Sequence, residues 1–234
     1  MVLSDEESKA IQEVAKTAAH YKDSATAFGA FFNRVVGHPL QQAGGLVGDT
    51  LGIVRIEMAL RFMKRVERIM EERGMDGPRR ALPLAIAYPL LEAATLEEDE
   101  TLSEMFAELL VNAISDEEAY IPKSFVETIK GMSPIEAAVL RAMADAPAEA
   151  KGPVGMMYTK ELPHCYLPAP TPQDKGWSDP PANIALALSA LISSGCVLPM
   201  ILMNGGWTTS QCRVSDYGVA FVKACRPPAD RGQS

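Results

Sequence analysis

The sequence predicts a mainly α-helical protein in two parts: a helical bundle over residues 1–122, and a winged-helix-like α+β module over residues 123–228. Apolar residues recur every three or four positions through the first part, which is the period of helices that bury one face. In the second part, helix signals lead to an apolar strand, an Asn-Gly-Gly turn and a second strand, a pattern typical of a β-hairpin wing. Residues 229–234 are expected to form a disordered tail.

Two helices are expected at the start of the first part. Ser4 and Glu7 form a capping box, so a helix should occupy most of the first 21 residues. Ser24 is expected to cap a second helix, which ends at Gly37. The glycine-rich segment Gln41–Gly52 then serves as a joint, or as a place where backbones approach closely.

Three more helices complete the bundle. The apolar period predicts a long helix over about Thr50–Arg73, ended by a glycine. Pro83 opens a short apolar helix in which Pro89 is expected to force a kink or a break. Thr95 with Glu98 is expected to cap the helix that follows.

The second part is divided by its own signals. A first helix is expected over Ile129–Ala144, within which the tetrapeptide beginning at Ser133 is itself a strong helix start. The proline-rich stretch 147–181 is interpreted as a long irregular insertion. The remaining predicted elements are a helix over Ala182–Cys196, strand, turn and strand over Val197–Val214, and a closing helix over Ser215–Cys225.

Composition and charge limit the partners. The formal charge is −8; residues 1–123 hold 13 Lys and Arg against 21 Asp and Glu, whereas residues 124–234 hold 9 of each. Nucleic-acid binders normally carry a basic surplus, so a nucleic-acid partner is disfavoured. The acidic N-terminus lacks the apolar core of a secretory signal, and scattered cysteines indicate reduced thiols. We expect a cytoplasmic protein, with peripheral attachment to the inner membrane as the alternative.

Residues 180–212 contain no charged side chain, which is long enough to cross a bilayer. Glycines, Pro199 and the Asn-Gly-Gly turn interrupt this stretch, so a buried helix followed by a buried hairpin is the preferred interpretation. The helix that would enter a DNA groove, Ala182–Cys196, contains no lysine or arginine. A packing or dimerisation role for this module is therefore favoured over DNA binding.

Two helices of the bundle carry matched stripes of charge. Their spacing places each set on one helix face: a basic stripe of Arg61, Lys64, Arg65 and Arg68, and an acidic stripe of Glu97, Glu100, Glu104 and Glu108. Each stripe is interpreted as a solvated face, or as one side of a pair of helices. The functional alternative for the basic stripe is docking of nucleic acid, lipid headgroups or an acidic partner.

The sequence contains no recognisable catalytic or metal-binding motif. The four cysteines, at 165, 196, 212 and 225, form no close pair of the kind that zinc sites use, and the last three fall at expected core positions. No phosphate loop follows a strand, and no nucleophile elbow is present. We therefore predict no metal, no cofactor and no small-molecule substrate, and a protein that is not an enzyme.

Several long runs resemble the abortive-infection alpha family. The resemblance covers roughly Phe28–Cys225, and its most specific run is PLLEAATLEEDETLSEMFAELLVNA. The other matching runs are Ala43–Met75, Ser124–Met143 and Ser215–Pro228. The characteristic positions are Leu90, Leu91, Glu92, Glu98, Asp99 and Asn112. Of these, Asn112 is a polar residue on an apolar face, and we expect it to satisfy a buried backbone group.

The resemblance implies bacterial defence against phage by abortive infection. The family's molecular activity is unassigned, so it implies no catalytic residues. Our favoured hypothesis is a non-enzymatic defence protein that acts through protein–protein contact, self-association or an oligomeric switch. One alternative is a membrane-active effector that uses residues 24–54, which are rich in phenylalanine and glycine. A second alternative is nucleic-acid binding through the basic stripe.

Overall fold

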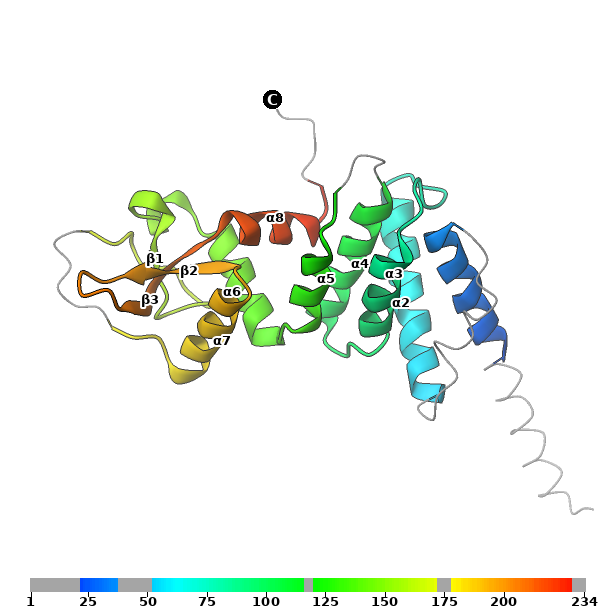
Figure 1. Ribbon diagram of the computed structural model, residues 1–234, viewed down its shortest axis with the longest axis horizontal. Coiled ribbons are helices and arrows are strands. Elements are labelled where there is room, and N and C mark those ends of the chain that lie inside the picture. The colour runs from blue at the N-terminus through cyan, green and yellow to red at the C-terminus, as the bar shows by residue number, and fades with distance from the viewer. Residues whose placement is uncertain (1–21, 38–51, 116–119, 172–177, 229–234) are drawn as a thin grey trace, which may run out of the picture. The chain divides into compact units, whose positions relative to one another are not determined.

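The computed structural model describes residues 22–37, 52–115, 120–171 and 178–228 (Figure 1). Over these residues the protein is mainly helical, with one three-stranded antiparallel sheet. The chain divides into two compact units, Met1–Val126 and Glu127–Ser234. The helix predicted from Ser4, nearly all of the glycine-rich segment, and the tail 229–234 lie outside the described residues.

The first unit is a set of helices. Helix 22–36 is followed by α2 (Gly52–Glu72), α3 (Leu84–Ala94) and α4 (Glu100–Ser115), and α5 (Lys123–Lys130) crosses the boundary between the units. Helices α2 and α3 both pack against α4. The N–H of Leu82 donates to the carbonyl of Val35 at 2.8 Å, and Arg34 pairs with Glu67 of α2 at 2.9 Å, which ties helix 22–36 to the rest of the unit. The largest buried side chains include Phe31, Phe32, Phe62, Phe106, Leu109 and Leu110.

Three local predictions for this unit are wrong. Ser24 is not a cap: it is buried inside helix 22–36. The break expected at Pro89 does not occur, since α3 continues to Ala94 with the proline in its second turn, and the alternative of a kink stays a prediction. The cap of α4 is Asp99, whose carboxylate accepts from the N–H of Leu102 at 2.9 Å. Thr95 instead follows α3, and its hydroxyl donates to the carbonyl of Glu92.

The second unit combines helices with the sheet. Its elements are α6 (Pro134–Asp145), two 3-10 turns (Ala148–Ala150 and Pro153–Gly155), β1 (Met157–Tyr158), α7 (Ala182–Ser193), β2 (Val197–Ile201), β3 (Trp207–Val214) and α8 (Asp216–Ala224). The strand order is β1-β3-β2, and Met157 pairs with Cys212 while Val197 pairs with Val214. Helices α6 and α7 pack on each other and on β3, and α8 packs on α6 and β3.

The predicted first helix of this unit, Ile129–Ala144, is interrupted. The chain leaves α5 after Lys130 and enters α6 at Pro134, because a residue before proline avoids the helical conformation. The helix start predicted at Ser133 is confirmed, and it is a capping box in which the N–H of Ser133 donates to the Glu136 carboxylate at 3.3 Å. The stretch 147–181 is not wholly irregular, since it contains β1. The other elements end within three residues of their predicted bounds.

The start of α8 lies against the connection between α7 and β2. The Ser215 hydroxyl accepts from the N–H of Gly218 at 2.9 Å and donates to the carbonyl of Gly195 at 2.5 Å. A Cβ placed on Gly218 would lie 2.1 Å from the carbonyl oxygen of Cys196, so no larger residue fits there without movement. This contact fixes α8 against the end of α7.

Candidate functional site

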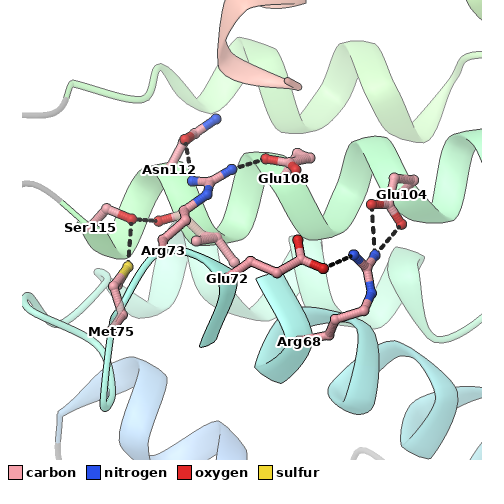
Figure 2. Close-up of polar contacts among 9 residues, drawn as sticks. Arg68, Glu72, Arg73, Met75, Glu104, Glu108, Asn112 and Ser115 are labelled. Atoms are coloured by element: carbon pink, nitrogen blue, oxygen red, sulfur yellow. Dashed lines mark hydrogen bonds and ion pairs between the residues drawn. The ribbon is translucent and has the colours of Figure 1, made fainter. Parts of the chain in front are cut away.

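The most extensive polar cluster of the first unit lies between α2 and α4, and Figure 2 shows most of its members. We call it the charged seam, and it consists of Arg65, Arg68, Glu72, Arg73, Glu104, Glu108 and Asn112. At its centre, the Glu104 carboxylate accepts from Arg65 Nε at 3.1 Å and from Arg68 Nη2 at 2.9 Å. The other arm of Arg68 reaches Glu72 at 2.8 Å. The carboxyls hold the pKa of Arg68 above its ordinary value, so this side chain stays charged.

The structure brings only part of the two predicted stripes together. Arg65 and Arg68 of the basic stripe meet Glu104 of the acidic stripe. Arg61 and Lys64 are exposed and form no ion pair with the described residues. Two acidic members also lie apart: Glu100 is exposed, and Glu97 accepts locally from the N–H of Asp99 at 2.8 Å. Glu108, the last acidic member, pairs with Arg73 at the end of α2, so the pairing between helices accounts for the C-terminal half of each stripe.

The buried end of the seam is formed by Arg73 and Glu108. These two side chains are ion-paired and only 15% and 6% exposed, and the Asn112 amide oxygen accepts from Arg73 Nη1 at 2.8 Å (Figure 2). Burial raises the pKa of the Glu108 carboxyl, and the Arg73 guanidinium offsets part of that shift by favouring the ionised form. The partner of the Asn112 oxygen is thus a side chain, where we expected a backbone group.

The end of α2 explains how Arg73 reaches this position. Gly74 has a left-handed conformation, with φ of +62°. The N–H of Met75 returns to the carbonyl of Met70, and that of Gly74 to Glu71, both at 2.9 Å, which is the hydrogen-bond pattern of a Schellman motif. Arg73 is the last residue before this turn, and the turn directs the chain away while its side chain extends to α4. The sequence prediction missed Arg73, although a basic residue just before a helix-ending glycine was a usable signal.

Three of the other family-motif residues, Leu90, Leu91 and Asp99, serve the fold of the first unit. Leu90 and Leu91 are each 1% exposed in the core, and Asp99 caps α4. Glu92 is half-buried, and Glu98 is exposed. None of these side chains forms a cluster of the kind that binds a metal, and no group of three His, Cys, Asp or Glu with that geometry is present among the described residues.

The turn end of the β2–β3 hairpin exposes apolar side chains. We call this surface the hairpin tip, and it consists of Ile201, Met203 and Trp207. Ile201 pairs across the strands with Trp207, and these side chains are 76% and 56% exposed. The prediction of a buried hairpin is therefore wrong at this end, although Val197 and Cys212 at the other end are fully buried.

The remaining sequence features have structural positions. Cys196, Cys212 and Cys225 are buried, as predicted, and burial raises the pKa of the Cys212 thiol to about 12, so it stays protonated. Among the described residues, none of the helices combines the length and the apolar character that crossing a bilayer requires. The described part of segment 24–54 buries Phe28, Phe31 and Phe32, each no more than 2% exposed.

Comparison with known proteins gives one family. The family model described as abortive infection alpha matches residues 57–204, well over half of the chain. The match covers the charged seam and runs into the turn of the hairpin. No curated protein and no solved structure matches the chain.

Proposed function

Given that the chain belongs to the abortive infection alpha family, and so to a group associated with defence against phage, we propose that it acts without catalysis. In this proposal, copies of the chain bind one another through the hairpin tip, and self-association brings about the arrest of the infected cell. The sequence motivates the non-catalytic part, since it contains no motif for nucleophilic, phosphoryl-transfer or metal chemistry. The cytoplasm is the proposed location.

The observation that carries the proposal is the exposed apolar surface at the hairpin tip. Tryptophan and methionine are enriched at protein interfaces, and a cross-strand pair with isoleucine gives them a fixed presentation. Leaving such side chains in water costs free energy that a partner surface recovers on binding. A second copy of the chain carries the same tip, so a symmetric contact needs no other protein.

The second unit is also proposed to be a winged-helix-like module with an assembly role. Its order of helix α6, strand β1, helix α7, hairpin and helix α8 supports this assignment. Helix α7 occupies the place of a groove-reading helix, yet its sequence, ANIALALSALIS, has no cation to contact phosphate. A role in packing or oligomer formation fits this composition better than DNA binding.

The two alternatives have weaker support. Nucleic-acid binding by the basic stripe would use Arg65 and Arg68, whose guanidinium groups already serve Glu104. A membrane-active segment 24–54 would have to release Phe28, Phe31 and Phe32 from the core, which costs about 2 kcal/mol for each side chain. The membrane alternative therefore requires the first unit to lose core contacts, and the nucleic-acid alternative is left with Arg61 and Lys64 as the members of the basic stripe that form no ion pair with the described residues.

The proposal is tested by linking assembly to protection. Cells expressing the protein are challenged with phage at low and high multiplicity, and the mass of the purified full chain is measured by light scattering over a range of concentrations. We expect oligomers, culture survival at low multiplicity and collapse at high multiplicity. The variant I201S/W207S should be monomeric and unprotective.

Leu96→Ser is the matched control, because Leu96 is 51% exposed in the first unit and does not belong to the hairpin tip. It should keep both assembly and protection. A wild-type chain that protects while it remains monomeric would refute self-association. Full protection by I201S/W207S would refute the role of the hairpin tip.

A further inference from the structure

We propose that the second unit contains a binding site for an organic phosphate, a small molecule with a phosphoryl group and a nonpolar body. The site is a pocket of about 480 Å³ bordered by the end of α6, the turn Pro153–Gly155, β3 and α8. Small-molecule sites commonly have volumes of about 300–1,000 Å³, so this pocket is large enough for a ligand of that class. The inference goes beyond the proposed self-association and does not depend on it.

The lining of the pocket is strongly cationic. Four basic side chains, Lys151, Arg213, Lys223 and Arg226, border it, and no carboxylate belongs to the lining. The guanidinium of Arg226 is held by the Asp145 carboxylate, with two hydrogen bonds at 2.5 and 2.7 Å. The ammonium of Lys151 donates to the carbonyl of Ala144 at 3.5 Å. These two cations therefore hold the end of α6.

Arg213 and Lys223 have no such structural task. Neither forms an ion pair or side-chain hydrogen bond with the described residues. One comes from β3 and the other from the last turn of α8, so two separate elements bring positive charge to one pocket. A phosphoryl group carries up to two negative charges and several acceptor oxygens, which suits a pair of uncommitted cations.

The rest of the lining is apolar. Met143 and Met157 are buried at 0% and 2% exposure, and Val219 and Val222 contribute from α8. Inorganic phosphate alone would leave the apolar side chains of Val154 and Val219, which are 79% and 55% exposed, in contact with water. A ligand with a nonpolar body, such as a nucleobase or a short alkyl chain, would cover them, and the flexible methionine side chains adapt to either shape.

The backbone beside the pocket is strained. Val154 has a left-handed conformation, with φ of +56° and ψ of +21°, which a β-branched residue rarely adopts. Its side chain lines the pocket and is 79% exposed, so burial does not compensate for this conformation. Hydrogen bonds of Gly152 to Met156 at 2.8 Å and of Gly155 to Gly152 at 3.0 Å hold the turn. Strain of this kind clusters at ligand-binding sites, which is an observation independent of the charge.

The test measures binding to the full chain by isothermal titration calorimetry. The probes are adenosine monophosphate, hexyl phosphate, adenosine and inorganic phosphate. We expect at least one of the two organic phosphates to bind about tenfold more tightly than inorganic phosphate, and adenosine to bind weakly, because both halves of the ligand contribute. The two organic phosphates distinguish an aromatic from an alkyl body.

Variants then locate the site. The variant R213Q/K223Q should weaken binding of the organic phosphate about tenfold, the effect of losing charge-assisted hydrogen bonds. The variant R61Q/K64Q removes the same charge from exposed residues of the first unit and should bind like wild type. Lys223→Gln alone should cause a smaller loss of affinity for the organic phosphate. Because Lys223 is exposed, this variant replaces the double variant if the latter fails to fold.

Three results would overturn the inference. The first is the absence of binding by both organic phosphates. The second is that the organic phosphate that binds more tightly does so no better than inorganic phosphate or no better than adenosine. The third is unchanged affinity in a folded R213Q/K223Q or Lys223→Gln variant. Because light scattering reports assembly separately, loss of ligand binding and loss of self-association are distinguishable.

Discussion

Helices α2 and α7 end in the same way, but the two units use that end differently. A left-handed glycine follows each helix, and the next N–H returns five residues back, from Met75 to Met70 and from Cys196 to Leu191. In the first unit, the residue before the glycine is Arg73, and its charge is neutralised on α4. In the second unit that residue is Ser194, and the backbone of Cys196 instead receives α8. The same helix end thus positions a buried ion pair, Arg73 with Glu108, in the first unit and a close backbone contact in the second.

The two units also differ in whether their charged side chains are paired. In the first unit, the arginines of the charged seam are paired with carboxylates, which commits them to structure. In the second unit, Arg213 and Lys223 border a pocket without such partners, and the hairpin tip is apolar. We therefore expect substitutions in the seam to change stability, and substitutions at the pocket or the tip to change binding.

The largest expected effect on stability comes from Glu108→Ala, which removes one partner of the buried Arg73–Glu108 ion pair. This change leaves the Arg73 guanidinium, only 15% exposed, without its carboxylate, and should lower the free energy of unfolding by about 3 kcal/mol. Urea unfolding of the full chain followed by circular dichroism measures the loss. The variant R73M/E108L should recover most of it, since it removes both charges together. A loss below about 1 kcal/mol would mean that the pair behaves like a surface salt bridge.

A smaller loss of stability is expected from Gly218→Ala, which disturbs the close contact between Gly218 and the Cys196 carbonyl in the second unit. The new Cβ would approach the Cys196 carbonyl oxygen to 2.1 Å, so α8 must shift, at a cost of about 2 kcal/mol. The same unfolding measurement applies. Gly77→Ala is the control, because nothing lies within 4 Å of a Cβ at that position. If both variants were equally stable, α8 would not be held by this contact.

The smallest expected effect is the pH dependence of stability that Glu108 gives the first unit at pH 4.5 and above. The folded-state pKa of Glu108 is raised above its ordinary value of 4.5, so the folded state binds this proton more readily than the unfolded state. The resulting stability is fully present below pH 4.5 and is lost as pH rises through the raised pKa. Relative to Glu108→Gln, wild type should therefore lose stability over that window. An unchanged difference between the two proteins across these pH values would contradict the shift.

Local signals in the sequence were sufficient to predict the ends of helices and the position of the hairpin. Ser133 with Glu136 marked the start of α6, and the glycine at 74 marked the end of α2. The Asn-Gly-Gly turn placed the hairpin. The acidic N-cap at Asp99 was missed because Thr95 with Glu98 fits the capping-box pattern, whereas the residue three positions after Asp99 is Leu102.

The candidate sites depended on contacts between distant residues, which periodicity does not report. The stripes were visible as stripes, but their partial pairing through Glu104 follows from how α2 lies on α4. Strand β1 is two residues long and exists only because β3, more than fifty residues later, pairs with it. The pocket is likewise lined by side chains from α6, β3 and α8, so no single segment of the sequence predicts it.

Strand β2 lies at an edge of the sheet, and Pro199 lies in its middle. Proline offers no N–H to an incoming strand, and the register of β2 against β3 shifts between Pro199 and Met200. The proline and the register shift oppose extension of the sheet by a neighbouring chain across the β2 edge. Copies that meet at the hairpin tip do so through side chains, which favours an assembly of fixed size over an open-ended fibre.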